Sequence, residues 1–205
     1  MNYEMIEYKL EEIADVKLSN VDKKTNLNEK QIKLCNYTDV YNNWNITKDM
    51  TDSFMIASCN ENEFEKFSIK KGQVAITKDS ETPDDIGNSA YIADDFQDVV
   101  LGYHLALITP FEEKLNGRYL NYLLHTKYLQ TYFENNAGGS GQRCTLVLDC
   151  LKSIPIHIPK LSIQNQIASV LSILDKKIAL NSKLNDNLPT PVRSLAWAKA
   201  NRVAA

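Results

Sequence analysis

Two carboxylates and a lysine are spaced so that they could serve a metal-dependent nuclease. Pro83-Asp84 and, further along, Glu112-Glu113-Lys114 fit a loose Pro-Asp…Glu-x-Lys pattern. In such sites two carboxylates hold Mg²⁺ and the lysine assists the attacking water. Asp84, however, lies in the turn-rich stretch 79–89, and acidic residues near a helix start suit the helix dipole in any protein. We therefore predict no catalytic residues and keep a Mg²⁺-dependent nuclease using Asp84, Glu112 and Lys114 as the alternative.

Other signals for catalysis are missing from the sequence. It has no Walker A motif, no Rossmann glycine fingerprint, no G-x-S-x-G and no Asn/Asp-Pro-Pro-aromatic motif of base-methylating enzymes. The four cysteines form no C-x-x-C pair, and the three histidines do not supply metal-ligand spacing. We predict free thiols, no metal site and no cofactor. The cysteines are Cys35, Cys59, Cys144 and Cys150.

Loop residues of the right kinds for contacting double-stranded DNA are more numerous. Lysines suit phosphates, arginine forks onto guanine, and glutamine pairs with adenine. Gln142 and Arg143 lie in the Gly-rich loop 137–145, and the loop 79–89 holds further polar residues. Taken singly, each is better explained as a solvated surface residue, whereas His104 is equally well explained as a residue facing the packing layer of a sheet. The candidate DNA-contacting residues are Lys48, Lys70, Lys71, Lys78, Ser80, Asn88, His104, Ser140, Gln142 and Arg143.

The overall charge gives no general attraction to nucleic acid. The 205 residues carry a formal net charge of −3, with a pI of about 5.7, so DNA binding would need a local basic face or a partner's charge. No apolar run approaches the length of a membrane span, and the acidic N-terminus lacks a signal-peptide core. We expect a cytoplasmic protein with no membrane segment.

Hydrophobic patterning predicts an α+β fold. Strands are predicted at 32–41, 73–78, 90–93 and 98–110, and a Pro-bounded edge strand at 154–159. Helices are predicted at 8–16, within 59–72, over 116–136 and within 146–153, with loops at 79–89 and 137–145. Together these elements predict a mixed, curved β-sheet domain with packed helices over residues 1–159.

The stretch 160–188 predicts one long, protruding, coiled-coil-like helix, with Ser162 as its cap. Its length would be about 40 Å, longer than the ~30 Å diameter of a domain of this size. Its apolar residues follow a heptad seam that Lys177 and Asn181 interrupt, and such interruptions fix register and partner. A helix folded back onto its own domain is the alternative. The seam and its neighbours are Ile163, Ile167, Val170, Leu171, Leu174, Lys177, Ile178, Asn181, Leu184 and Leu188.

Read together, these segments resemble the specificity subunit of type I restriction–modification enzymes over about residues 4–188. The most specific stretch is "LKSIPIHIPKLSIQNQIASVLSILDKKIALNSKLNDNL", with an Ile/Pro strand, "QxxIAxxL" ending at Leu171 and "LDxKIxxN" ending at Asn181. Supporting matches are "KGQVAITKDS", "YHLALITP" and "AGGSGQR…L…LKSIPI". The helix signature is specific, whereas the other matches are individually weak.

The resemblance implies a subunit that performs no chemistry. Such subunits read a split DNA site with target recognition domains, and their long helices act as spacers that dock methyltransferase (M) subunits, which restriction/motor (R) subunits join. Members usually have two recognition domains and two helices, and this chain has one of each. It is therefore similar to a half-length subunit whose copies pair through 162–188 into a homodimer, for which two-fold symmetry predicts a palindromic bipartite site.

The tail 189–205 departs from the family's pattern. "PTPVRSLAWAKANRVAA" replaces the acidic, Ala/Leu-rich continuation that members commonly show. Beside the specificity subunit and the nuclease, a third hypothesis is a regulatory fragment that exchanges into a full-length specificity subunit.

Overall fold

The computed structural model describes residues 4–139 and 143–186. Contacts divide the chain into two compact units, Met1–Asn165 and Gln166–Ala205, and each is described by itself. All of the assigned strands lie in the first unit. The long helix α6 (Leu161–Asp186) begins in the first unit and forms the described part of the second. The mixture of sheets and packed helices confirms the predicted α+β class.

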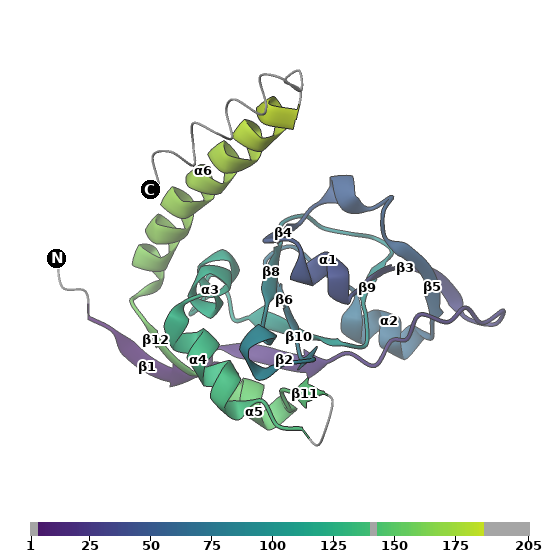
Figure 1. Ribbon diagram of the computed structural model, residues 1–205, viewed down its shortest axis with the longest axis horizontal. Helices are drawn as coiled ribbons and strands as arrows, with labels where there is room; N and C mark the ends of the chain where they lie inside the picture. The colour runs from purple at the N-terminus through teal and green to yellow at the C-terminus, as the bar shows by residue number, and fades with distance from the viewer. Residues whose placement is uncertain (1–3, 140–142, 187–205) are drawn as a thin grey trace. The chain divides into compact units, whose positions relative to one another are not determined.

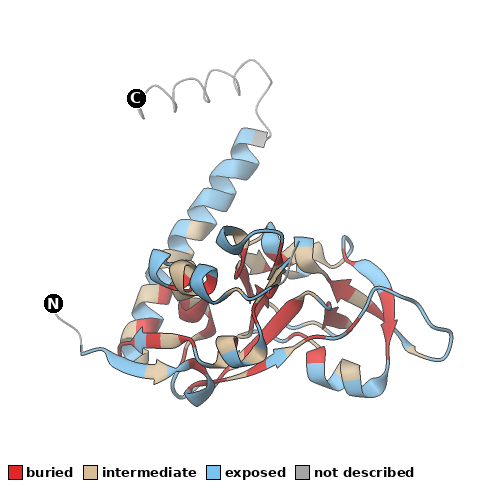
Figure 2. Ribbon diagram, turned by 60° about the horizontal axis from the view of Figure 1, so that its bottom comes forward, coloured by how far each residue is buried: buried red, intermediate tan, exposed pale blue. Residues whose placement is uncertain are grey.

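The largest sheet has five strands in the order β2-β10-β6-β8-β4 (Figure 1). Its pairings are antiparallel except for the parallel pair β4–β8. The central strands are buried on both faces (Figure 2), which explains their unbroken apolar sequences. Helices α1 and α3 pack against β6 and β8. The bounds are β2 (Ala14–Leu18), β4 (Asn45–Ile46), β6 (Val74–Thr77), β8 (Ser89–Ile92), β10 (Leu105–Pro110), α1 (Tyr37–Tyr41) and α3 (Gly117–Leu124).

A three-stranded sheet, β5-β3-β9, shares the main core with this larger sheet. β3 pairs antiparallel with β5 and parallel with β9. Ile32 and Leu34 from this sheet and Ile92 and Leu105 from the larger one belong to a single buried cluster. The bounds are β3 (Lys30–Cys35), β5 (Met55–Cys59), β9 (Val99–Leu101) and α2 (Glu61–Phe67).

Two short two-stranded sheets complete the first unit. β1 pairs with β12, and β7 pairs with β11, both antiparallel. β12 is therefore an edge strand, as its prolines predicted. The bounds are β1 (Ile6–Lys9), β12 (Pro155–Ile158), β7 (Asp79–Ser80), β11 (Cys144–Thr145), α4 (Lys127–Asn136), α5 (Leu148–Lys152) and the 3-10 turns η1 (Leu10–Glu12), η2 (Lys48–Met50) and η3 (Pro83–Asp85).

Three predicted helical features are corrected by the structure. The helix over 8–16 is wrong, because η1 separates the ends of β1 and β2, and the Glu12 carboxylate accepts the Lys9 backbone N–H at 2.6 Å. The predicted helix 116–136 is two helices, because Thr126 is extended (φ −71°, ψ 148°) between α3 and α4. Ser162 is not the cap of α6: it lies inside the helix, and the Lys160 carbonyl accepts the first backbone bonds.

A buried glutamine joins the first turn of α6 to the rest of the first unit. The Gln164 side chain is fully buried. Its Oε1 accepts from the Asn116 backbone N–H at 3.0 Å, and its Nε2 donates to the carbonyls of Lys114 (3.0 Å) and Pro159 (2.9 Å). One side chain thus pairs three backbone groups from the segment before α3 and the segment before α6.

We expect Gln164→Leu to lower the free energy of unfolding by about 2–3 kcal/mol, because the three backbone groups lose their partner while they stay covered. Urea unfolding followed by circular dichroism measures the change. Asn165→Leu is the neighbouring control, since Asn165 is exposed and its side chain accepts a hydrogen bond from the Asn116 side chain at 2.8 Å. An equal loss in both variants would show that the buried contacts of Gln164 carry no special weight.

Candidate functional site

Three of the predicted DNA-contacting residues meet around one hollow of about 510 Å³, which we call the β7 hollow. Ser80 comes from β7, His104 from the turn between β9 and β10, and Arg143 from the residue before β11. These residues are far apart in sequence, and the β7–β11 pairing with β6 and β10 brings them together. The lining residues are Asn36, Tyr37, Tyr41, Asp79, Ser80, Glu81, Thr82, Asp85, His104 and Arg143.

One wall of the β7 hollow is the short helix α1. The Asn36 side chain accepts the Tyr37 backbone N–H at 2.8 Å, and Asp39 accepts the Asn36 backbone N–H at 2.8 Å. This capping box starts a helix where the strand-like pattern 32–41 predicted continued strand. Tyr37 and Tyr41, one helical turn apart, stack with ring centroids 5.5 Å apart. Two aromatic faces are thereby fixed on the wall.

Asp79 lines the β7 hollow and accepts hydrogen bonds from three side chains. Its Oδ2 accepts from Lys78 Nζ at 2.9 Å and from His104 Nδ1 at 2.8 Å, while its Oδ1 accepts from the Thr145 hydroxyl at 2.8 Å. Burial pushes the pKa of Asp79 upward, but the hydrogen bonds from His104, Lys78 and Thr145 outweigh it and hold the pKa below its usual value. Asp79 is therefore a carboxylate at neutral pH.

Asp85 also lines the β7 hollow and accepts hydrogen bonds from two side chains. Tyr41 donates its hydroxyl to the two Asp85 carboxylate oxygens at 3.1 and 2.9 Å, and the Asn88 amide donates to Oδ1 at 3.3 Å. The hydrogen bond to Asp85 raises the pKa of Tyr41, so that its hydroxyl stays a donor. Asn88, a predicted DNA-contacting residue, thus contacts Asp85 but is not itself among the residues that line the β7 hollow.

The hollow is not a phosphate-gripping surface. Asp79, Glu81 and Asp85 line it together with Arg143 and His104, so carboxylates outnumber cations, and an anionic backbone would be repelled. Carboxylates, hydroxyls, an amide and an arginine are instead the groups that pair with base edges in a DNA groove. The chemistry of the lining favours reading bases over holding the backbone.

The predicted lysines are placed differently from one another. The Lys78 side chain is 9% exposed and lies 4.6 Å from the Tyr103 ring, so its ammonium is a buried partner of Asp79. Lys48, Lys70 and Lys71 are exposed and do not line the β7 hollow. The backbones of Lys48 and Lys71 donate to Asp94 and Asp95, at 3.0 and 3.1 Å. Ser140 and Gln142 lie outside the described residues.

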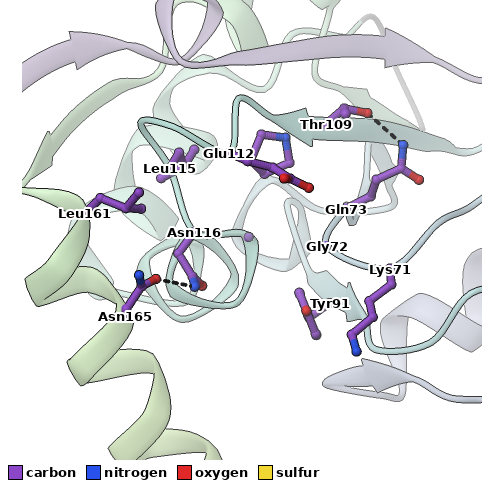
Figure 3. A pocket seen from close by; sticks show the side chains of 12 residues that line it. Lys71, Gly72, Gln73, Tyr91, Thr109, Glu112, Leu115, Asn116, Leu161 and Asn165 are labelled. Atoms are coloured by element: carbon purple, nitrogen blue, oxygen red, sulfur yellow. Dashed lines mark hydrogen bonds between the residues drawn. The ribbon is translucent and has the colours of Figure 1, made fainter.

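A smaller pocket of about 270 Å³ contains Glu112 and Lys71 (Figure 3). It forms where the turn before β6 touches the start of α3, since an added Cβ at Gly117 would collide with the Gly72 carbonyl. The three nuclease-like residues do not converge here: Asp84 lies in η3, and Lys114 Nζ donates to the Glu12 carbonyl at 3.1 Å. Within 4–139 and 143–186, no three His, Cys, Asp or Glu side chains are grouped to hold a metal.

The apolar side chains of α6 beyond Gln166 are largely uncovered. Val170, Leu174, Ile178 and Leu184 of the predicted seam are each at least half exposed, as are Ile173 and Leu180 on a neighbouring stripe. Ile167 and Leu171 are partly buried, as is Ile163 in the first turn, and Lys177 and Asn181 are exposed. Leu188 lies outside the described residues. None of the described helices is both long and apolar enough to cross a bilayer.

Sequence reasoning missed Asn36, Tyr37, Tyr41, Asp79 and Asp85 as members of the site. A signal for α1 existed, because Asn36 followed by Asp39 at the third position is a capping-box spacing. No local signal marked Asp79, whose partners come from positions 78, 104 and 145. Only the folded sheet brings those partners within reach.

Comparison with known sequences gives a consistent result. The family profile described as "Type I restriction modification DNA specificity domain" matches residues 2–190. The "Type I restriction enzyme HindI specificity subunit" of Haemophilus influenzae is 27% identical over 131 residues, which are 63% of this chain and 28% of that protein.

Comparison with solved structures concerns the fold. A chain from a study of complex assembly and conformational transition of the type I R-M system matches with a TM-score of 0.63 and 16% identity, over 99% of this chain and 44% of that one. The S subunit of M. genitalium matches with a TM-score of 0.58 and 15% identity, over 90% of this chain and 42% of that one. The HsdS subunit of Thermoanaerobacter tengcongensis gives 0.59 and 15%, over 90% and 40%. The chain spans less than half the length of these relatives.

Proposed function

Since the chain belongs to the type I restriction modification DNA specificity domain family, we propose that its first unit reads one half of a bipartite site in double-stranded DNA. The observation that carries the proposal is the β7 hollow. It gathers base-reading groups from α1, β7, the β9–β10 turn and the start of β11. The family description names DNA specificity rather than catalysis, so the chain contributes recognition and leaves chemistry to its partners.

In this proposal the predicted residues have separate tasks. Arg143, Ser80 and His104 read base edges from the β7 hollow, with Gln142 and Ser140 beside Arg143 in sequence. Lys48, Lys70 and Lys71, which are exposed, contact phosphates. Lys78 and Asn88 support the hollow by fixing Asp79 and Asp85, which their side chains contact. Because these three lysines supply few phosphate contacts, a partner is proposed to supply the remaining contacts to the DNA backbone.

We propose that α6 joins this chain to two kinds of partner. The seam of Ile167, Val170, Leu174 and Ile178 pairs with the same helix of a second copy, giving a homodimer. Ile173 and Leu180 lie about 100° around the helix from that seam, a second exposed stripe. An apolar arc this wide suits a helix that packs against more than one neighbour. The second stripe is proposed to dock a methyltransferase (M) subunit, to which restriction/motor (R) subunits add.

The direct test is methylome sequencing of cells that express the chain with its methyltransferase subunit. Methylation at a split motif with two specified halves is the expected result. Two copies reading identical half-sites give a palindromic motif. The proposal would be overturned if methylation occurred without any specified sequence, or if it did not depend on this chain.

Arg143→Ala is expected to relax sequence preference at one position of the half-site. Losing a fork onto guanine costs about 1–3 kcal/mol on the preferred DNA and little on DNA that already lacks that base. Fluorescence anisotropy with preferred and single-substituted duplexes measures both. Lys70→Ala is the comparison, because losing a phosphate contact weakens binding to both duplexes alike. A uniform loss in Arg143→Ala would make Arg143 a backbone contact.

The exposed apolar side chains of α6 suit one second candidate function. In this alternative the chain is a regulatory fragment that exchanges into a full-length specificity subunit, whose helix covers α6 in place of a second copy. Co-expression with such a subunit distinguishes the two. Recovery of a mixed complex in preference to a homodimer would favour the exchange fragment.

A further inference from the structure

His104 is held so that its two ring nitrogens have different tasks. Nδ1 lies 2.8 Å from Asp79 Oδ2, and the lowered pKa of Asp79 keeps that group a carboxylate, which can only accept. Nδ1 must therefore carry the proton. In a neutral imidazole, Nε2 is then the unprotonated nitrogen and accepts hydrogen bonds.

Nε2 is also the nitrogen left available. Nε2 is the ring nitrogen that does not contact Asp79, and the His104 side chain, 39% exposed, lines the β7 hollow. Within 4–139 and 143–186 no hydrogen bond to Nε2 is present. The Tyr103 ring packs edge-on against the imidazole with centroids 5.0 Å apart, which restricts its rotation. A fixed ring thus offers one acceptor to the hollow.

We infer that His104 Nε2 selects an amino-bearing base, adenine or cytosine, over a keto base, guanine or thymine, at one position of the half-site. This inference rests on the proposed function and names the chemistry of one contact. In the major groove adenine N6 and cytosine N4 donate, whereas guanine O6 and thymine O4 accept at the equivalent place. A lone-pair nitrogen attracts the first pair of bases and repels the second.

Two substitutions separate the nitrogens. Asn places an amide N–H where Nδ1 is, so His104→Asn keeps donation to Asp79 but lacks Nε2. Gln reaches the place of Nε2 and carries both a donor and an acceptor that do not titrate. Thermal melts followed by circular dichroism establish that each variant is folded before binding is measured.

The experiment selects duplexes from a pool of double-stranded oligonucleotides with a randomised segment, using the full chain. For the wild type we expect one position to be enriched in adenine or cytosine over guanine or thymine, by about tenfold. His104→Asn should leave that position unspecified and the rest of the motif intact. His104→Gln, whose amide both donates and accepts, should keep a contact there without the preference for amino-bearing bases.

The outcomes separate two failures. Identical motifs for the wild type and His104→Asn would overturn the role of His104 while DNA reading stands. An unenriched pool with the wild-type chain would overturn the proposed function and this inference with it.

Discussion

Asp79→Ala is expected to destabilise the protein by about 3 kcal/mol. The Lys78 and Asp79 side chains are only 9% and 16% exposed, and their charged atoms lie 2.9 Å apart. Removing the carboxylate leaves a covered ammonium without its counter-charge, which is the costly way to break such a pair. It also removes the acceptor of His104 Nδ1 and of the Thr145 hydroxyl. Urea unfolding at neutral pH measures the loss.

The matched control is Asp15→Ala. Asp15 and Lys17 form an ion pair with the same 2.9 Å separation, but their side chains are 46% and 47% exposed. The control should cost less than about 1 kcal/mol, because water screens that pair. Lys78→Met added to Asp79→Ala removes the stranded charge and should recover part of the loss. Equal effects at Asp15 and Asp79 would refute the role of burial.

Acid provides an independent check on Asp79. Its pKa is lowered in the folded protein, so its stabilising contribution is full above the unfolded pKa, ordinarily near 4, and is lost as pH falls through the lower, folded value. The difference in unfolding free energy between wild type and Asp79→Ala should therefore be largest near neutral pH and shrink below about pH 4. A difference that stayed constant down to about pH 2 would contradict this assignment.

Leu174→Asp combined with Ile178→Asp is expected to turn the proposed homodimer into a monomer. Both side chains lie on the predicted seam and are 50% and 67% exposed in the single chain. Two carboxylates in each helix would meet their copies across a closed apolar contact, where unpaired charge is strongly unfavourable. Sedimentation equilibrium should give a mass near the 23.3 kDa of one chain rather than twice that value.

Ile173→Asp combined with Leu180→Asp is the matched pair on the neighbouring stripe. These side chains are 61% and 58% exposed, so the chemical change is equal and only its place on the helix differs. The dimer mass should persist in this variant, while capture of a methyltransferase subunit is lost. Monomers from both variants would show that no single face is the dimer contact, and an unchanged dimer from the seam variant would remove the seam from that role.

Hydrophobic patterns within short stretches of sequence predicted helices and strands correctly where one periodicity, helical or extended, clearly dominates. The strands at 73–78 and 90–93 were confirmed because both lie in the buried sheet and carry unbroken apolar runs. The stretch 8–16 failed because Leu10 and Ile13, three residues apart, fit a helical face while a 3-10 turn between two strands places them in the same core. In a window that short the two periods cannot be told apart.

The site was predictable in kind but not in arrangement. Arginine and serine in polar loops were recognised as base-reading groups, and the structure places Arg143 and Ser80 around one hollow. The sequence could not predict that Lys78 would be buried against Asp79, since that depends on contacts made only in the fold, such as the Tyr103 ring 4.6 Å from the lysine ammonium. Charge alone predicts an exposed lysine, and tertiary packing decided otherwise.

The pairing of β1 with β12 has a consequence for synthesis of the chain. Ile6 pairs with Ile158, so the first strand acquires its partner only after about 150 further residues have been translated, roughly 8–30 s at ordinary rates. Until then the edge of β1, with Ile6 and Tyr8, has no native partner to pair with. A ribosome that stalls anywhere in that interval leaves a nascent chain whose ends are unjoined and whose first strand is open to a chaperone or to another nascent chain.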